Sequence, residues 1–170
     1  MKKVISEQDL QDQISKLASI INKDDFNHRR SVVFVGILNG AFMFFSDLVK
    51  KINIPIEIDF VRVKSYDGQN RKKIKFTKDL EVDVKGKHVY LVDDIIDSGH
   101  TMKFLMDKFS ERGAIHVTPV AAVYKDNLVI QDALCILRYS QDSPWFVGYG
   151  MDHEDGTCRN IETILELDGK

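Results

Sequence analysis

The chain has 170 residues, of which 44% are hydrophobic and 29% charged, and its formal net charge at pH 7 is −2. This length and composition suit a globular protein with its own core, so we expect one domain spanning residues 1–170. The negative charge argues against broad nucleic-acid binding, and no apolar run reaches the roughly 20 residues that a membrane span needs. Cys135 and Cys158 form no CxxC motif, and the N-terminus turns polar before a secretory signal could form, which favours the cytoplasm.

The N-terminal part of the chain predicts a helix, a strand and a second helix. Ser6 and Asp9 suit the cap of the first helix, whose apolar face consists of Leu10, Ile14, Leu17, Ala18 and Ile21. The charged stretch 23–30 is expected to form a loop, and the apolar run 31–38 a buried parallel strand. A second helix follows, with an apolar face formed by Phe44, Phe45, Leu48, Val49 and Ile52. Backbone amides at its start, after Asn39 and Gly40, suit an anion, although a plain strand-to-helix turn explains these two residues as well.

The middle of the chain predicts a strand over residues 54–63 and then a polar, basic, glycine-containing stretch at 65–73. This stretch predicts an exposed loop, which is either a solvated hairpin tip or a lid that closes over an anionic substrate. Residues 75–80 return to the core, and residues 84–87 form a turn. A buried strand over 88–92 then leads directly into an acidic cluster.

The C-terminal part alternates helix and strand. Residues 102–109 predict an amphipathic helix that ends at Gly113, and residues 115–123 predict another buried strand. Shorter strands are expected at 134–137, within the aromatic segment 143–152, and at 161–167 as an edge strand. Because strands and helices alternate, we expect a single α/β domain with a central, mostly parallel sheet flanked by helices.

Three carboxylates, Asp93, Asp94 and Asp97, follow the strand over residues 88–92. Like charges so close together are costly unless a cation or hydroxyl groups lie between them, and two carboxylates suit a ribose diol or a hard divalent cation. The turn at 98–101 offers backbone N–H groups and hydroxyls at a helix start, which suit a phosphate. Open α/β sheets bind ligands at such strand ends. The pattern therefore predicts a sugar-phosphate site, and the simple alternative is helix capping with solvated acids.

Residues 89–101 resemble the phosphoribosyl pyrophosphate signature of the type I phosphoribosyltransferases: four apolar residues, two acids, two apolar residues, then Asp-Ser-Gly-x-Thr. Other segments resemble the hypoxanthine-guanine members of that family in the same order, namely 38–48, 65–66, Lys125, and 146–152 with Arg159. These segments span most of the chain between residues 31 and 160. The resemblance implies the type I phosphoribosyltransferase fold with a small hood formed by the terminal segments.

The resemblance assigns the acidic stretch to the sugar phosphate. Asp93 and Asp94 would contact the ribose hydroxyls, directly or through Mg²⁺, and Asp97 would be the acid/base group facing N7 of the purine. Ile96 would also contact the substrate. The 5′-phosphate would bind to Ser98, Gly99, His100 and Thr101.

The resemblance assigns the other segments to the pyrophosphate and the base. Asn39 and Gly40 would hold pyrophosphate with help from Arg159, and Ser65 and Tyr66 would lead the lid. The residues expected around the base are Lys125 at the purine 6-oxo group, Trp145 stacked on the ring, and Phe146 at its edge. Asp152 would help to bind a second Mg²⁺.

The chain departs from the family pattern at two positions. Asn39 stands where Lys or Arg is expected, so one positive contact to pyrophosphate is missing. His100 stands where Lys is frequent. The lid is also slightly shorter than usual. Taken alone, Lys125 is explained equally by a surface lysine at a strand end, and Trp145 by a core residue.

The expected activity joins hypoxanthine or guanine to phosphoribosyl pyrophosphate with Mg²⁺, in a dimer or tetramer as is common in the family. A sister enzyme that prefers xanthine would show the same pattern. A non-catalytic regulator of this fold that binds nucleic acid should show a basic face or an added DNA-binding domain, and neither is visible. A P-loop nucleotidase would need GxxxxGK[S/T], which is absent.

Overall fold

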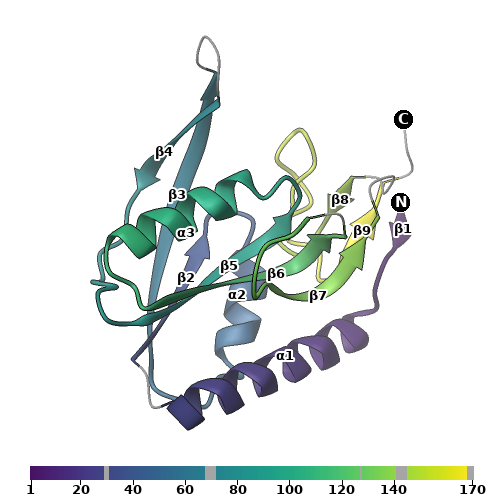
Figure 1. Ribbon diagram of the computed structural model, residues 1–170. Coiled ribbons are helices and arrows are strands. Elements are labelled where there is room, and N and C mark those ends of the chain that lie inside the picture. The colour runs from purple at the N-terminus through teal and green to yellow at the C-terminus, as the bar shows by residue number, and fades with distance from the viewer. Residues whose placement is uncertain (29–30, 68–71, 127, 141–144, 168–170) are drawn as a thin grey trace.

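A six-stranded sheet in the order β4-β3-β2-β5-β6-β7 forms the centre of the computed structural model (Figure 1). The strands are β2 (Val32–Ile37), β3 (Ile56–Asp67), β4 (Lys72–Lys78), β5 (His88–Ile96), β6 (His116–Lys125) and β7 (Leu134–Tyr139). The structure describes residues 1–28, 31–67, 72–126, 128–140 and 145–167, with only the backbone of 25–28, 65–67 and 72–73.

Five of these strands run parallel, and only β4 pairs antiparallel with its neighbour. Parallel strands that are covered on both faces need continuous apolar sequence, and β2 is buried over its whole length. The predicted, mostly parallel sheet is confirmed. Its consequence is that the carboxyl ends of β2, β5, β6 and β7 meet at one edge of the sheet.

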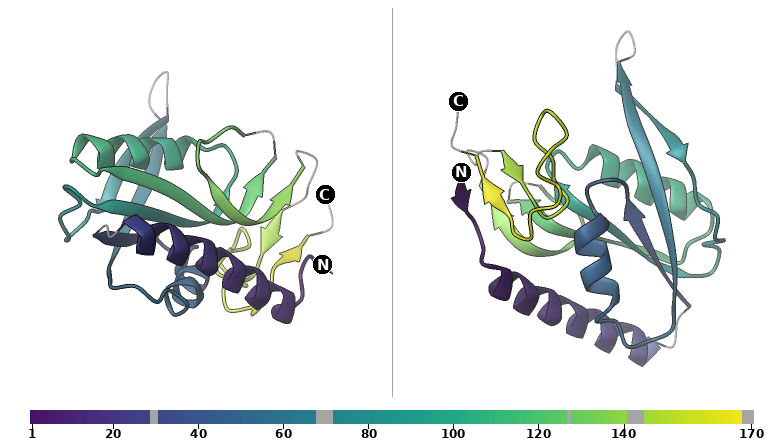
Figure 2. Two further views of the ribbon diagram at one scale, coloured as in Figure 1. Left: turned by 60° about the horizontal axis from the view of Figure 1, so that its bottom comes forward. Right: turned by 180° about the vertical axis from the view of Figure 1, so that it is seen from behind.

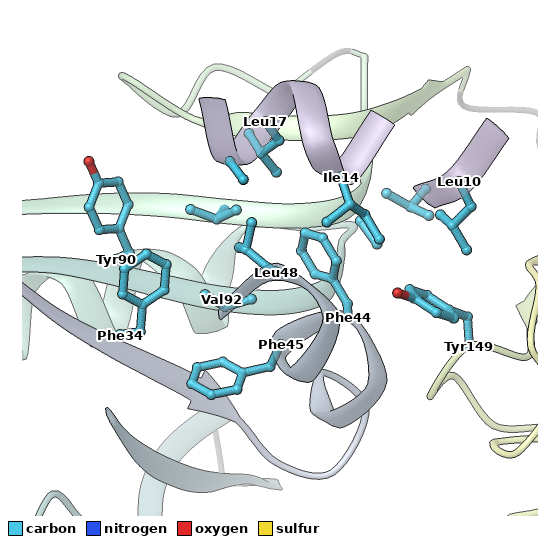
Figure 3. Packing of buried hydrophobic residues seen from close by; sticks show 14 of the residues in the cluster. Leu10, Ile14, Leu17, Phe34, Phe44, Phe45, Leu48, Tyr90, Val92 and Tyr149 are labelled. Carbon is cyan, nitrogen blue, oxygen red and sulfur yellow. The ribbon is translucent and has the colours of Figure 1, made fainter. Parts of the chain in front are cut away.

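Helices cover both faces of the sheet (Figure 2). On one face lie α1 (Glu7–His28) and α2 (Phe42–Val49), and on the other lies α3 (His100–Glu111). Figure 3 shows the first core, in which Leu10 and Ile14 of α1 and Phe44 of α2 pack with Val92 of β5. Alternate residues of the same strands, such as Leu91, pack against α3 instead. Two apolar layers therefore hold the central strands rigidly.

A second, three-stranded antiparallel sheet joins the two ends of the chain. Its order is β1-β9-β8, with β1 at Lys2–Lys3, β8 at Phe146–Val147 and β9 at Leu165–Glu166. Figure 1 shows the N-terminus at this sheet and the arrowheads of β6 and β7 pointing toward it. The predicted hood of terminal segments is confirmed. Among the described residues, no helix is long and apolar enough to cross a membrane.

Two predicted loops contain regular structure, so those predictions were wrong. The first helix includes residues 23–28 of the charged stretch 23–30, because charged side chains such as the exposed Lys23 and Asp24 do not break a helix. Residues 29–30 lie outside the described residues. Residues 65–67 belong to β3 and residues 72–73 to β4, where Ser65 is opposite Ile74 and Tyr66 is opposite Lys73. The described part of the stretch 65–73 is therefore a hairpin rather than a loop, and residues 68–71 lie outside the described residues.

Two strands are longer than predicted, and both extensions reach the site. β5 continues past Val92 to Ile96, and β7 continues past Leu137 to Tyr139. In both strands the added residues pair with β6, which gives their backbone N–H and C=O groups hydrogen-bond partners within the sheet. Ser6 caps α1 as predicted, since its Oγ accepts a hydrogen bond from the Asp9 amide at 3.1 Å.

Candidate active site

The ends of β5, β6 and β7 bring three polar side chains together. Ile96 of β5 is paired with Tyr124 of β6, so Asp97 follows at the level of Lys125. Lys125 is in turn the register partner of Tyr139, the last residue of β7. The three neighbouring strands end at the same level of the sheet, so side chains from distant positions in the sequence meet there.

The contact point is a single oxygen of Asp97. Lys125 Nζ donates a hydrogen bond to Asp97 Oδ1 at 2.6 Å, and the Tyr139 hydroxyl donates to the same oxygen at 2.9 Å. The Lys125 contact lowers the pKa of Asp97, against an opposing effect of burial, and the Tyr139 hydrogen bond lowers this pKa further. Burial and the Asp97 charge raise the pKa of Tyr139. Asp97 is therefore held as a carboxylate beside a protonated phenol and a lysine.

Asp93 and Asp94 form a second acidic group at the end of β5. Burial raises the pKa of Asp93 well above its usual range, and the nearby Asp94 charge raises it further. Burial also raises the pKa of Asp94, although its hydrogen bonds and the charge of Arg159 oppose this. Two carboxylates that interact in this way favour a cation or hydroxyl groups between them.

Gly40 packs directly against the carboxylate of Asp94. A Cβ on Gly40 would lie 1.8 Å from Asp94 Oδ2, and a Cβ on Gly150 would lie 1.9 Å from the Gly40 carbonyl oxygen. The Ala41 amide donates to the Ile37 carbonyl at 3.3 Å, so it is already used within the turn that starts α2. The peptide bond between Leu38 and Asn39 is cis. The loops after β2 and β8 and the end of β5 can approach this closely only with glycine at positions 40 and 150.

The turn between β5 and α3 borders a small cavity with a volume of about 140 Å³. Its lining includes Asp93, Asp97 and the predicted phosphate residues Ser98, Gly99 and Thr101. Gly99 precedes α3 with a φ of 71°, a conformation that favours glycine. The His100 ring lies 3.1 Å from Ser98 Oγ and is exposed. The geometry is a hydroxyl-bearing turn at a helix start, next to carboxylates.

The loop after β8 contributes the other side of the site. Trp145 is 60% exposed and its indole N–H donates to the Asp152 carbonyl oxygen at 3.1 Å, so its interpretation as a core residue is wrong. Arg159 holds the same loop, since it pairs with Asp152 Oδ2 at 2.5 Å and donates to the Gly150 carbonyl at 2.7 Å. Phe146 is buried beside the Tyr139 ring, with centroids 5.1 Å apart.

The predicted residues fall into two structural groups. Asp97 with Lys125, Gly40 with Asp94, and Asp152 with Arg159 and Trp145 are in contact at the strand-end edge. Ser65 and Tyr66 instead lie in β3, on the hairpin that projects from the sheet in Figure 1, and only their backbone is described.

The acidic residues at this edge include candidate ligands for a metal ion. Within the described part of the chain, no three His, Cys, Asp or Glu side chains are grouped so that they could hold a metal ion by themselves. The Asp93–Asp94 pair fits Mg²⁺ in the manner usual for this ion, in which one or two carboxylates bind it together with substrate oxygens and water. Asp152 forms an ion pair with Arg159.

Sequence reasoning missed Tyr139 and the pair Asp47–Tyr149. The Tyr149 hydroxyl donates to Asp47 Oδ2 at 2.7 Å and so ties the loop after β8 to α2. Tyr139 was missed because the strand was expected to end at Leu137. The sequence could have indicated Tyr139, because this residue lies at the carboxyl end of the strand that follows the strand of Lys125.

A larger cavity, of about 670 Å³, lies between α1 and the amino-terminal ends of β5, β6 and β7. Ile20, Tyr90 and His116 are among its lining residues, and none of the predicted site residues is. The predicted site residues lie at the opposite ends of these strands, beside the smaller cavity.

A family model described as a phosphoribosyl transferase domain matches residues 4–153. The chain therefore belongs to the phosphoribosyl transferase domain family. It is 34% identical over 156 residues to a hypoxanthine phosphoribosyltransferase of Haemophilus influenzae, covering 88% of this chain and 86% of that one. It is 34% identical over 166 residues to a hypoxanthine-guanine phosphoribosyltransferase of Streptococcus pneumoniae, covering 96% and 91%.

Solved structures agree with this assignment. A crystal structure of a hypoxanthine phosphoribosyltransferase from Staphylococcus aureus superposes with a TM-score of 0.89 at 29% identity, covering 98% of this chain and 91% of that chain. A hypoxanthine-guanine phosphoribosyltransferase from Bacillus anthracis superposes with a TM-score of 0.86 at 30% identity, covering 98% and 96%. The type I phosphoribosyltransferase fold expected from the sequence is confirmed.

Proposed function

We propose that this chain transfers the phosphoribosyl group of phosphoribosyl pyrophosphate to hypoxanthine or guanine, giving IMP or GMP and pyrophosphate. The observation that carries the proposal is the Asp97–Lys125 pair, in contact at 2.6 Å between the phosphate-binding turn and the loop of Trp145. A carboxylate and a lysine at that point match the N7 proton and the 6-oxo group of a purine. The names of the relatives support the same substrates.

In the proposed reaction the purine N9 bonds to C1 of the ribose while the bond from C1 to the pyrophosphate oxygen breaks, and its electron pair leaves with pyrophosphate. Asp97 takes the proton from N7, which keeps electron density on the attacking ring. The Lys125 contact keeps Asp97 ionised and therefore ready to accept that proton. We therefore propose proton transfer for Asp97 and recognition of the oxo group for Lys125, and their contact supports this assignment.

The exposed Trp145 ring suits stacking on the purine. An aromatic side chain supplies a large apolar contact with few rotatable bonds, so it costs little entropy to order. Its hydrogen bond to the Asp152 carbonyl fixes the ring at the edge of the site. Phe146 offers backbone groups for the edge of the base and lies buried behind it.

The leaving pyrophosphate is assigned to Asn39, Gly40 and Arg159. Arg159 is the positive charge on this side, and it is held by Asp152 and the Gly150 carbonyl. Asn39 brings an uncharged amide where a cation would bind pyrophosphate more strongly. Ser65 and Tyr66, on the β3–β4 hairpin, are proposed to close over this side and exclude water.

The proposal includes Mg²⁺, which Asp93 and Asp94 would hold; Asp152 would help to hold a second ion. When bound, Mg²⁺ supplies charge neutralisation of the leaving pyrophosphate. The raised pKa of Asp93 supports this, since buried neighbouring carboxylates favour a cation.

We propose that residues 1–170 act as one phosphoribosyltransferase domain, in the cytoplasm and as a dimer or tetramer. Both cysteines, Cys135 and Cys158, are free thiols, which suits a reducing compartment. Light scattering after size-exclusion chromatography measures the number of subunits directly.

The test is an assay with the protein, Mg²⁺, phosphoribosyl pyrophosphate and one base at a time: hypoxanthine, guanine or xanthine. Nucleotide formation with hypoxanthine or guanine is expected. Product with xanthine alone would replace the proposal with the xanthine-preferring alternative. Absence of product with every base would leave the non-catalytic alternative, in which the protein still binds phosphoribosyl pyrophosphate.

A further inference from the structure

We propose that Tyr139 is a positioning residue that holds Asp97 in place while Lys125 is engaged by the purine. This inference rests on the proposed function, in which Asp97 takes the N7 proton and Lys125 binds the 6-oxo group. It concerns a residue outside the motif segments, from the last strand of the central sheet. Three contacts of the Tyr139 side chain carry it.

The first contact is the hydrogen bond from the Tyr139 hydroxyl to Asp97 Oδ1 at 2.9 Å. Lys125 Nζ binds the same oxygen at 2.6 Å, so one carboxylate oxygen has two donors. Among the described residues, Oδ2 of Asp97 makes no hydrogen bond. Oδ1 is thus the anchored oxygen, and Oδ2 is the oxygen that remains for the purine.

The second and third contacts fix the phenol ring. Tyr139 packs edge-on against the buried Phe146, with centroids 5.1 Å apart, and Lys125 Nζ lies 6.0 Å from the Tyr139 ring centroid. Backbone pairing with Lys125 sets the height of Tyr139 on the sheet. A hydroxyl on a ring held by packing loses little freedom when it binds Asp97, so it is a better anchor than a flexible lysine.

Purine binding makes the difference between the two donors important. Once Lys125 Nζ turns to the 6-oxo group, it shares or leaves Asp97, and Asp97, 59% exposed in its side chain, would be free to rotate. Tyr139 keeps one strong hydrogen bond to Oδ1 in that state. The carboxylate then loses part of the stabilisation of its charge at the moment when it must accept a proton, while its orientation is preserved.

Asp93 of β5 lines the same small cavity as Asp97. The titratable groups that hydrogen-bond to Asp97 among the described residues are Lys125 from β6 and Tyr139 from β7. Both stabilise the carboxylate, and so removal of the Tyr139 hydroxyl raises the pKa of Asp97. This gives the inference a readout that packing alone would not change.

The experiment compares wild type, Tyr139→Phe and Tyr90→Phe. Tyr139→Phe keeps the ring against Phe146 and removes only the hydroxyl; Tyr90→Phe removes the hydroxyl of a buried tyrosine in the first half of β5. We expect Tyr139→Phe to lower kcat with hypoxanthine about tenfold, the loss of one hydrogen bond to a charged group, with KM for phosphoribosyl pyrophosphate unchanged. The acid limb of its kcat/KM profile should move to higher pH, and Tyr90→Phe should keep the wild-type profile.

A second measurement is independent of turnover. The Asp97 carboxyl ¹³C signal, assigned by its absence in Asp97→Asn, is titrated by NMR in wild type, Tyr139→Phe, Lys125→Met and the double variant. The pKa of Asp97 should rise in each single variant and most in the double variant. If the wild type is active and Tyr139→Phe changes neither the pKa of Asp97 nor kcat, the inference about Tyr139 is overturned and the proposed function stands. Inactive wild type would overturn both the proposed function and the inference.

Discussion

The backbone of Gly40 lies directly against the carboxylate of Asp94, with room for a hydrogen atom but not for a Cβ, which would stand 1.8 Å from Oδ2. Gly40 belongs to the loop after β2, and Asp94 belongs to the neighbouring strand β5. In the proposed site, this contact joins the pyrophosphate side to the ribose side. A substitution at either residue therefore displaces groups on both sides.

Gly40→Ala should lower kcat/KM for phosphoribosyl pyrophosphate about a hundredfold, because a displacement of about 1 Å in a catalytic group has a cost of this order. Gly86→Ala is the control, since its Cβ would meet nothing within 4 Å although its φ is 73°. That variant should lose about 1 kcal/mol of stability through backbone strain and keep its activity. Steady-state kinetics and urea unfolding of both proteins test this, and a fully active Gly40→Ala protein would contradict it.

Asp97→Asn should lower kcat by about a hundredfold or more, the usual contribution of a general base. Binding of phosphoribosyl pyrophosphate should change little, because the phosphate turn at 98–101 and the Asp93–Asp94 pair remain intact. Asp107→Asn, an exposed aspartate of α3, is the matched control and should behave as wild type. Turnover and calorimetric binding are measured in parallel, and equal losses in both would refute the proton-transfer role.

Trp145→Ala should raise KM for hypoxanthine about tenfold, because stacking of a base on an aromatic ring contributes about 1–3 kcal/mol. Trp145→Phe should retain most of the affinity. Since Trp145 is 60% exposed, neither variant should lower the melting temperature by more than a few degrees. A large loss of stability with an unchanged KM would show instead that Trp145 has a structural role.

Asp59 should make the fold sensitive to acid. Its buried carboxylate accepts hydrogen bonds from the Glu81 amide at 2.6 Å and the Val82 amide at 3.0 Å, and it pairs with Lys78 at 3.3 Å. Burial alone would raise the pKa of Asp59, but these hydrogen bonds together outweigh burial and lower it. The stabilisation is therefore complete above the unfolded-state pKa of about 3.9 and is lost as the pH falls through the folded-state pKa.

Asp59→Asn should accordingly lose about 2 kcal/mol of unfolding free energy at pH 7, and the difference from wild type should shrink toward about pH 3. Urea unfolding curves over this pH range measure it. Asp83→Asn is the control, since Asp83 is exposed and accepts one hydrogen bond, from the Lys85 amide, in a turn. The same deficit for Asp59→Asn at every pH would argue against a charge-dependent contribution.

Local pattern was sufficient to predict that carboxylates and a hydroxyl-bearing turn lie together at the start of a helix. The strand, the acids and the Ser-Gly turn of residues 89–101 are contiguous, so their order alone places carboxylates beside a helix start. The extents of α1 and of the β3–β4 hairpin were misjudged for a related reason. Charged residues suit an exposed helix face or strand as well as a loop, and only tertiary packing and strand pairing decide between them.

The sequence by itself determined the parallel sheet and the strand edge at which polar groups meet, because buried apolar runs and adjacent residues are local properties. It also predicted the chemistry of the acidic turn. Only the tertiary structure decided that Tyr139 meets Asp97, 42 positions earlier in the chain, and that Trp145 is exposed. Those facts depend on the register of β6 against β5 and β7. Register is set by packing across the whole sheet, since one slipped residue would turn every side chain to the other face.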